Sequence, residues 1–336
     1  VADVPVGVLL SGGLDSSLIT AISKEYKNNL NTCSIGFETI DNEGGDEFHY
    51  SDMVANNLKT LHEKYSVTSF DLLNSLDDVI MSMSEPMFSQ DSSAFYLLAK
   101  NVSKSAKVVL SGQGADEVFG GYFWYKKIMN ETDLNSIDTL SKYYFDRSYE
   151  NFKTIVHSDF INENYASNDI GSRLKQMDPN LSILDKIFRL ELSMFIIDDP
   201  VKRVDNMTMS HSLEARVPFL DIDLISFMLS VKSEKKIENG EKCLLKEVSK
   251  KYLDNKIINR EKFYFPVPPL KIIKDKFFDY CRKTLLSESA LERNLYNTSY
   301  INKILEKPNE HFTNLNGNEL WHFTLLERWL QLNIDR

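Results

Sequence analysis

Two short turns, each joining an apolar segment to a helical one, constrain the fold of this chain most strongly. Residues 4–10 (VPVGVLL) and 107–110 (KVVL) have the continuous apolar character of buried strands. A Ser-Gly turn follows each. After the first turn apolar residues recur every four positions as far as residue 26, which predicts an amphipathic helix. Strand, turn and helix repeated in this way predict an α/β fold with a parallel sheet flanked by helices.

Glycine is scarce in the chain, so its position in the two turns is informative. The sequence holds 13 glycines in 336 residues, and seven of them lie in residues 7–13 and 112–121. Glycine is needed where the backbone takes a positive φ or approaches a ligand closely. Since the carboxyl ends of parallel strands share one edge of a sheet, we expect the two turns to face a common ligand. Either turn alone is equally consistent with an ordinary βα connection capped by serine.

Both turns lead into a helix N-terminus, where free N–H groups and the helix dipole favour a phosphate. Each also carries a carboxylate, Asp15 in the first turn and Asp116 in the second. A carboxylate beside a phosphate is repulsive unless a hard cation lies between them. The sequence therefore predicts Asp15 and Asp116 as Mg²⁺ ligands, with simple stabilisation of the helix dipoles as the alternative. The patterns GxxxxGK[ST] and GxGxxG are absent.

The same motifs resemble those of a known family. Residues 11–16 (SGGLDS) resemble the pyrophosphate loop of the N-type ATP pyrophosphatases, and residues 111–122 (SGQGADEVFGGY) resemble the second signature of the asparagine synthetase family. Further segments fit the same family in the same order: residues 207–221, 241–246, 260–262 and 325–330. The resemblance runs from residue 2 to about residue 330 and implies an adenine-nucleotide α-hydrolase-like fold.

The resemblance also implies a reaction. Enzymes of this family use ATP and Mg²⁺ to attach a substrate carboxylate to the α-phosphorus with loss of pyrophosphate, and ammonia then displaces AMP. Aspartate and ammonia are the substrates this implies, with asparagine as product. Fixed cations near the α-phosphorus and the departing pyrophosphate would stabilise the charge of the transition state.

Site residues carried over by position fall into three groups. Asp15 and Asp116 are the implied metal ligands. The implied ATP-binding residues are Leu10, Ser11, Gly12, Gly13, Asp15, Ser16, Ile35, Gly36, Ser111 and Gly112. The implied catalytic residues are Lys242, Lys262, Gln113 and Arg203. For a single lysine a solvated surface position is the ordinary expectation, which the motif context reverses here.

Gln113 departs from the pattern, because some asparagine synthetases carry a glutamate at that position. A neutral amide cannot act as a base, although it can hydrogen-bond a substrate. The same adenylation chemistry on another acid, as in β-lactam synthetases, is therefore the alternative activity. A nucleotide-binding module without catalysis is the alternative from another class, and retention of Asp15, Asp116, Lys242 and Lys262 together argues against it.

The composition of the chain limits the kinds of partner that it can bind. Lys+Arg total 39 against 49 for Asp+Glu, a net charge of −10, which argues against a nucleic-acid or anionic membrane surface. No secretory signal is visible, and the three cysteines, Cys33, Cys243 and Cys281, lack metal-ligand spacing, so we expect a cytoplasmic protein. Family members of this kind usually carry a preceding glutaminase domain. We expect it to be absent from this chain and to be a partner domain in the parent protein. A homodimer is left open.

We expect one synthetase domain over residues 1–336, with a nucleotide-binding α/β core over 1–130 and a mainly helical remainder over 131–336. Further predicted elements are strands at 33–37 and 61–67, a helix at 92–104, an exposed mobile loop at 41–47, and a helix at 181–197 that is ended by residues 198–200 (DDP). Residues expected to be structural are His211, Glu214, Arg216, Asp221, Trp321 and Trp329.

Overall fold

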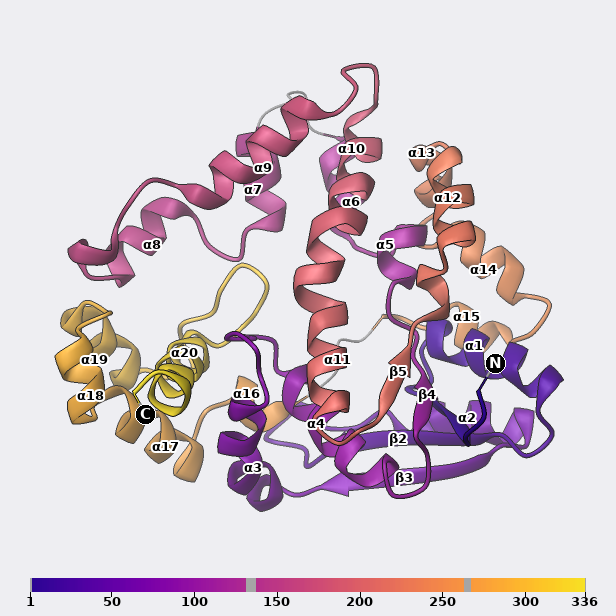
Figure 1. Ribbon diagram of the computed structural model, residues 1–336, viewed down its shortest axis with the longest axis horizontal. Coiled ribbons are helices and arrows are strands. Elements are labelled where there is room, and N and C mark those ends of the chain that lie inside the picture. Colours follow the sequence, from indigo (N-terminus) through magenta and orange to yellow (C-terminus); the bar gives the residue numbers. More distant parts are fainter. Residues whose placement is uncertain (1, 131–136, 263–266, 336) are drawn as a thin grey trace.

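A five-stranded parallel sheet is the base on which the rest of the chain is built (Figure 1). The structure is a computed structural model that describes residues 2–130, 137–262 and 267–335. The strand order is β3-β2-β1-β4-β5. The strands are β1 (Val6–Leu9), β2 (Asn31–Phe37), β3 (Leu61–Val67), β4 (Val108–Leu110) and β5 (Glu214–Arg216). The predicted parallel sheet is confirmed, although the short strand β5 was not foreseen.

Register places the ends of the central strands side by side. Leu9 of β1 pairs with Cys33 of β2, and Val8 pairs with Leu110 of β4. Val8 and Val109 are fully buried, as expected for strands covered on both faces. The chain therefore leaves β1 and β4 at the same edge of the sheet.

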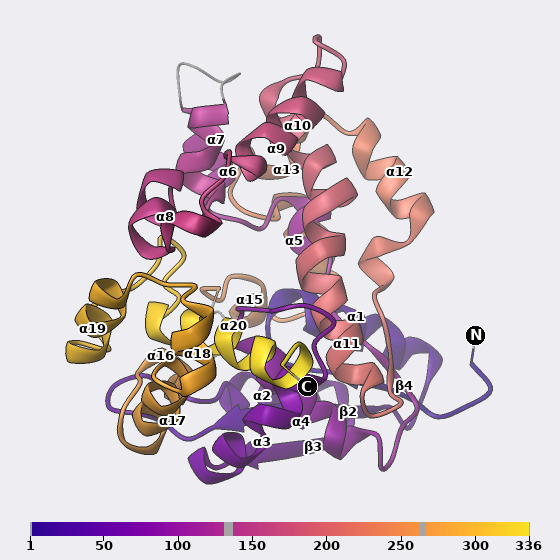
Figure 2. The same ribbon diagram turned by 60° about the vertical axis from the view of Figure 1, so that its left-hand side comes forward.

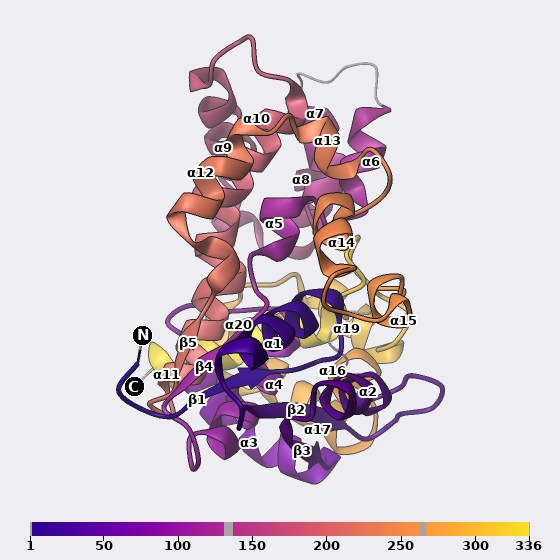
Figure 3. The ribbon, with the colours of Figure 1, turned by 90° about the vertical axis from the view of Figure 1, so that its right-hand side faces the viewer.

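Helices cover both faces of the sheet (Figure 3). On one side, α1 (Leu14–Tyr26) packs on β1. The same apolar cluster includes α5 (Ala115–Phe119), α12 (Ile222–Ser230) and α14 (Cys243–Ser249), with α12 and α14 both packed on α5. On the other side, α4 (Asp91–Val102) packs on β2 and β3, and α11 (Lys202–Met209) packs on β5. The same apolar cluster includes α3 (Ser69–Met81), α17 (Asp275–Leu285) and α20 (Glu319–Asn333), with α20 packed on α3 and α17 on α20. Trp321 of α20 is buried, as predicted for a core residue.

A separate helical layer stands above the sheet (Figure 2). Its helices are α6 (Trp124–Met129), α7 (Ile137–Tyr144), α8 (Tyr149–Ile155), α9 (Tyr165–Gln176), α10 (Ile183–Leu190) and α13 (Ser233–Ile237). Tyr125, Ile128 and Phe188 are fully buried within it. The remaining helices are α2 (Phe48–Leu58), α15 (Asn255–Ile258), α16 (Pro268–Lys271), α18 (Glu288–Arg293) and α19 (Thr298–Glu306).

The helix predicted to end at Pro200 continues through it, so that prediction is wrong. Two π-helical segments, Glu191–Phe195 and Ile197–Val201, join α10 to α11 in one long rod. Proline cannot donate to an i−4 carbonyl and its ring collides with it in a regular α-helix. The wider π turns relieve that conflict, and such turns occur often at functional sites.

Loop 41–47 is largely exposed, as predicted, but ion pairs attach it to the C-terminal part of the chain. Lys271 Nζ lies 2.7 Å from Glu43, and Lys274 Nζ lies 2.7 Å from Asp41. Asp221 caps α12 rather than joining the Glu214–Arg216 ion pair. Within the described ranges, the chain has no helix with the length and apolarity needed to span a bilayer.

Leu76 of α3 is fully buried in the core beneath the sheet, whereas Leu291 of α18 is 56% exposed. We expect Leu76→Ala to lower the free energy of unfolding by about 2–5 kcal/mol, because it removes buried apolar surface and leaves a cavity. Leu291→Ala should change it by less than about 0.5 kcal/mol. Urea unfolding of the two variants measures the difference, and equal effects would contradict the packing described.

Candidate active site

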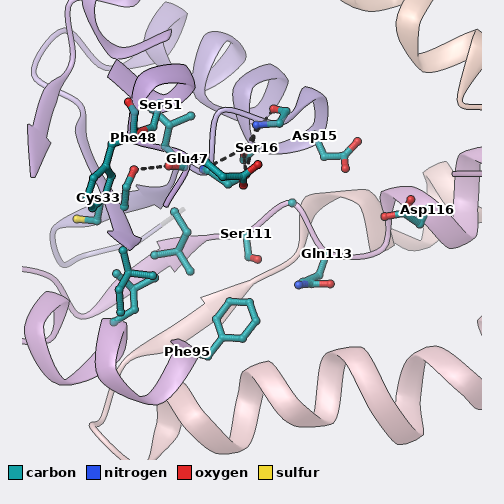
Figure 4. A pocket seen from close by; sticks show the side chains of 18 residues that line it. Asp15, Ser16, Cys33, Glu47, Phe48, Ser51, Phe95, Ser111, Gln113 and Asp116 are labelled. Carbon is teal, nitrogen blue, oxygen red and sulfur yellow. Dashed lines mark hydrogen bonds between the residues drawn. The ribbon is translucent and has the colours of Figure 1, made fainter. Parts of the chain in front are cut away.

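The two predicted turns meet at one edge of the sheet and border a cavity (Figure 4). The cavity has a volume of about 170 Å³. At Gly112, an added Cβ would lie 3.0 Å from the Ser16 backbone nitrogen, so the turns are in close contact. The expectation that both turns lie at one edge of the sheet is confirmed, and a common ligand for them stays a prediction.

Most of the ATP-binding residues implied by the resemblance line this cavity. They are Leu10, Ser11, Gly13, Asp15, Ser16, Ile35, Ser111 and Gly112. Gln113 and Asp116 also line it. The sequence did not point to Glu47, Phe48 and Ser51, which line the side formed by the start of α2, nor to Phe95 of α4. No local motif marks them, because they reach the cavity only through packing of α2 and α4 on the sheet.

The first turn is held by its own hydroxyl groups. Ser11 Oγ and Ser16 Oγ lie 3.0 Å apart, and the Ser11 N–H donates to Ser16 Oγ at 3.2 Å. Gly13 is the N-cap of α1 and offers no side chain to cap the helix. The first turn of α1 therefore lacks a capping side chain where it borders the cavity, and an anion there could accept from its N–H groups.

Gly12 and Gly36 act by close approach of backbone rather than by lining the cavity. Gly12 has φ +77°, and an added Cβ would lie 2.5 Å from the backbone of Tyr50 and Ser51. At Gly36 an added Cβ would lie 2.5 Å from Asp46. Both glycines let the start of α2 lie tightly against the turn and strand β2.

Four charged groups from distant parts of the chain form one network at the cavity edge. Lys242 Nζ lies 2.7 Å from Asp15 Oδ2 and 2.9 Å from Asp116 Oδ1. Lys262 Nζ lies 2.5 Å from the same Asp116 oxygen and 4.6 Å from the centre of the Tyr122 ring. The structure thus brings together both implied metal ligands and both implied catalytic lysines.

Local structure explains how these groups converge. Asp15 and Asp116 lie in the first turns of α1 and α5, where the helix dipole favours a carboxylate. Lys242 is the N-cap of α14 with φ +52°, which turns its side chain back toward α5. Gly121 leaves room for it, since an added Cβ would lie 1.9 Å from an Asp116 oxygen.

The two carboxylates differ in their electrostatics. Burial raises the pKa of Asp15, and the attraction of Lys242 offsets this only in part. Burial acts on Asp116 in the same direction, but Lys242 and Lys262 together outweigh it and lower its pKa to about 2. The difference follows from contact with one lysine against two. Burial disfavours the charge of Lys242, yet the two aspartates raise its pKa, so it stays cationic.

The aspartates fit a divalent cation shared with phosphate. Asp15 Oδ1 is buried and has no hydrogen-bond partner, so a ligand position is open. Both carboxylates contact one ammonium nitrogen, which occupies the kind of position that a cation between them would take. In the described residues no group of three or more acidic, histidine or cysteine side chains is arranged to hold a metal ion, so phosphate oxygens would have to complete the shell.

A second layer of buried carboxylates lies behind the network. Tyr122 donates to Glu117 at 2.7 Å, and Tyr125 donates to Glu191 at 3.1 Å. Burial raises the pKa of Glu117 to about 7, with the Asp116 charge adding to the rise. Burial raises the pKa of Glu191 to about 8, with Glu117 contributing. Glu191 was missed from the sequence because it lies in a predicted apolar helix, at the point where the π turns begin.

Arg203 does not line the cavity. Its side chain is buried, with Nε 2.8 Å from Asp91 and a second ion pair to Asp199 on the same helix. These contacts anchor α11 to α4. His211, predicted to be a packing residue, lies edge-on to Tyr96 with ring centres 4.4 Å apart.

Comparison with known proteins identifies the family of this chain. The model of the family described as asparagine synthase matches residues 1–331. The chain belongs to the asparagine synthase family. It is 27% identical to asparagine synthetase [glutamine-hydrolyzing] 1 of Bacillus subtilis over all of this chain and 57% of that protein. It is 28% identical to asparagine synthetase 3 of B. subtilis, over 79% of this chain and 45% of that protein. It is also 28% identical to asparagine synthetase 1 of Arabidopsis thaliana, over 78% of this chain and 39% of that protein.

The chain spans about half the length of the curated relatives it matches. Family membership therefore covers the sheet, the two turns and the charged network described above. The alignment with the first B. subtilis protein includes the whole chain, so the helical layer belongs to the same family unit.

Glu191 predicts a distinct dependence of stability on pH. A glutamate normally ionises near pH 4.5 but holds its proton to about pH 8 in the fold, so the free energy of unfolding should fall as pH rises between these values. Glu191→Gln should remove this contribution and stabilise the protein at alkaline pH by about 1 kcal/mol or more relative to acidic pH.

Urea unfolding of the wild type and Glu191→Gln across that range measures the effect. Glu310→Gln, at a side chain that is 62% exposed, is the control and should retain the wild-type slope. A Glu191→Gln profile parallel to that of the wild type would contradict the burial argument.

Proposed function

We propose that this chain is a synthetase unit that adenylates a carboxylic acid at the α-phosphorus of ATP and transfers the acyl group to ammonia. The products are an amide, AMP and pyrophosphate, and the preferred acid is aspartate, giving asparagine. The observation that carries the proposal is the network of Asp15, Asp116, Lys242 and Lys262 at the mouth of a cavity between two anion-binding turns.

The turns and the cavity bind different parts of ATP. Backbone N–H groups and the hydroxyls of Ser11 and Ser16 donate to the pyrophosphate portion at the N-terminus of α1. Ile35 and Leu10 border the adenine, while Ser111 and Gly112 lie against the ribose from the opposite strand. In this pose the α-phosphorus lies between the two turns, beside Gln113.

The lysines act on developing charge. Attack of the substrate carboxylate at the α-phosphorus leaves negative charge on its equatorial oxygens and on the departing pyrophosphate. Lys242 and Lys262 are compact cations that the network already holds at the cavity edge, where they would stabilise that charge. Mg²⁺ held by Asp15 and Asp116 would neutralise the phosphates when ATP binds, and lets two carboxylates lie beside them.

Gln113 lies on the cavity wall beside Ser111, where its amide can donate to the acyl carbonyl or accept from the substrate amine (Figure 4). It cannot take the proton released when ammonia attacks. This neutral side chain favours a second candidate, the same adenylation on a different acid, as in β-lactam synthetases.

The relatives carry the description glutamine-hydrolyzing and are about twice as long as this chain. We propose that ammonia reaches this unit from a glutaminase domain in the parent protein, and that free ammonia can replace it. We place the protein in the cytoplasm, without nucleic-acid or membrane partners.

Phosphorus NMR tests the reaction class directly. The chain is mixed with ATP, Mg²⁺, ammonium and aspartate, and we expect AMP and pyrophosphate to appear only when all are present. Turnover of another acid but not aspartate would select the second candidate. Formation of ADP and phosphate would refute α-phosphoryl attack.

Asp15→Asn tests the metal site through binding alone. We expect Mg²⁺ to strengthen ATP binding to the wild type, and the variant to lose that gain by at least about tenfold. Without Mg²⁺ the variant should bind ATP as well as the wild type or better, because one carboxylate fewer repels the phosphates. Calorimetric titration of each protein with ATP, with and without Mg²⁺, measures this difference. Asp169→Asn, at an exposed side chain, is the control. Unchanged Mg²⁺ dependence would rule out Asp15 as a ligand.

Lys262→Met tests the role of the lysine in the transition state. We expect kcat to fall by about 100-fold or more with a smaller change in the KM for ATP, since the charge it stabilises develops only in the transition state. Lys271→Met is a matched control, because both side chains are 36% exposed and each is paired with one carboxylate. Full turnover by Lys262→Met would contradict the assignment.

A further inference from the structure

Arg260 is buried beside the cavity, and no step of the proposed reaction uses it. Its side chain is only 6% exposed and forms an ion pair with Glu47. The guanidinium carbon lies 3.9 Å from the centre of the Tyr50 ring, so the group stacks on α2. A buried guanidinium is costly unless it is paired, so a specific role for this contact is expected.

The surface on which Arg260 docks is part of the nucleotide site. Glu47 lines the cavity, and Tyr50 packs against Gly12 of the first turn. The first turn of α2 is therefore fixed by the same backbone contacts that shape the phosphate-binding turn. A group that contacts Glu47 and Tyr50 is therefore held at a fixed position relative to that turn.

The other side of Arg260 leads directly to Lys262. The preceding helix α15 is anchored by Ile257, which is buried in a cluster with Leu10, Val54 and Ala55. Two residues after Arg260, the Lys262 ammonium reaches Asp116 and also donates to the Gly121 carbonyl at 3.3 Å. Arg260 is thus a buried attachment point two residues before Lys262, whose side chain is itself 36% exposed.

We propose that Arg260 is a positioning residue, whose guanidinium docks the Lys262 segment onto the first turn of α2 so that the Lys262 ammonium meets Asp116 and the phosphates of bound nucleotide. This inference rests on the proposed function for its catalytic consequence. The geometric part of the inference, that the position of Lys262 depends on Arg260, does not rest on the proposed function.

The planar guanidinium suits this role better than an ammonium would. Its central carbon lies over the Tyr50 ring while a terminal nitrogen pairs with Glu47, so two contacts with different parts of the group hold it in place. Removing it alone would leave Glu47 as an unpaired charge on the cavity wall. The informative variant is therefore Arg260→Met combined with Glu47→Gln, which removes both charges together.

Chemical labelling of lysines tests the geometric part without any activity. A limiting amount of an acetylating reagent is applied, and the rate of modification at each lysine is followed by peptide mass spectrometry. We expect the double variant to raise the rate at Lys262 several-fold. Lys242, whose side chain is 7% exposed, is the internal reference and should keep its slow rate. Arg173→Met, at an exposed ion pair on α9, should leave both rates unchanged.

A kinetic double-mutant cycle tests the catalytic part. The double variant Arg260→Met/Glu47→Gln should lower kcat by about 10- to 100-fold in the wild-type background, the loss typical of misplacing a catalytic group. In the Lys262→Met background it should add little further loss, because both substitutions remove one function. Fully additive losses would overturn the proposal and indicate that Arg260 acts on the nucleotide by itself.

The outcomes separate this inference from the proposed function. A wild type that forms no AMP refutes the proposed function, while the labelling result still decides whether Arg260 positions Lys262. Unchanged Lys262 labelling, or equal rises at Lys242 and Lys262, overturns the positioning role. If Arg260→Met does not fold cooperatively, Arg260→Lys keeps the charge without the planar group, and we expect intermediate labelling from it.

Discussion

The ion network of Asp15, Lys242, Asp116 and Lys262 is the interaction on which the arrangement of the site depends. Its members come from α1, α14, α5 and the segment after α15, which lie far apart in the sequence. Asp15 and Asp116 would be repulsive neighbours without the lysines, and Lys242 would be a costly buried charge without the aspartates. The lysines offset the repulsion between the two aspartates, and the aspartates offset the cost of burying Lys242. The network is therefore stable only when all four segments come together.

The sheet and the helical layer serve this network from opposite sides. Adjacent parallel strands β1 and β4 deliver the two turns to one edge, which fixes α1 and α5. The long rod from α10 to α11 places Glu191 behind α5, where the carboxylate shares the interior with Glu117. Burial raises the pKa values of these two carboxylates to about 7 and about 8, which reduces the negative charge behind Asp116 at neutral pH.

The residues in and next to the two turns could be predicted from the sequence, because local sequence patterns identify them. Apolar runs marked β1, β2, β3 and β4, and the Ser-Gly motifs marked the anion-binding turns. Family motifs also carried Lys242 and Lys262, although nothing in their spacing shows that both meet at Asp116. That convergence depends on the positive φ of Lys242 and the space beside Gly121, which are properties of the folded backbone.

What the sequence did not reveal depends on packing between distant elements. Glu47 looks like part of an exposed acidic loop until Arg260 is seen buried against it. Strand β5 is three residues long and too short for a periodic signal, and Pro200 indicated a helix end because the π turns that accommodate it have no sequence signature. Arg203 matched a family motif, yet its contacts tie α11 to α4 rather than line the cavity.

Isotope transfer tests the central claim most directly, because it follows the bond that the network is proposed to help form. The acid that supports turnover is labelled with oxygen-18 in its carboxylate, and the AMP produced with ATP and ammonia is examined by mass spectrometry. If the carboxylate attacks the α-phosphorus, the bridging oxygen stays with AMP, so AMP should gain one labelled oxygen for each amide formed. AMP without the label, or label in inorganic phosphate beside ADP, would contradict the account.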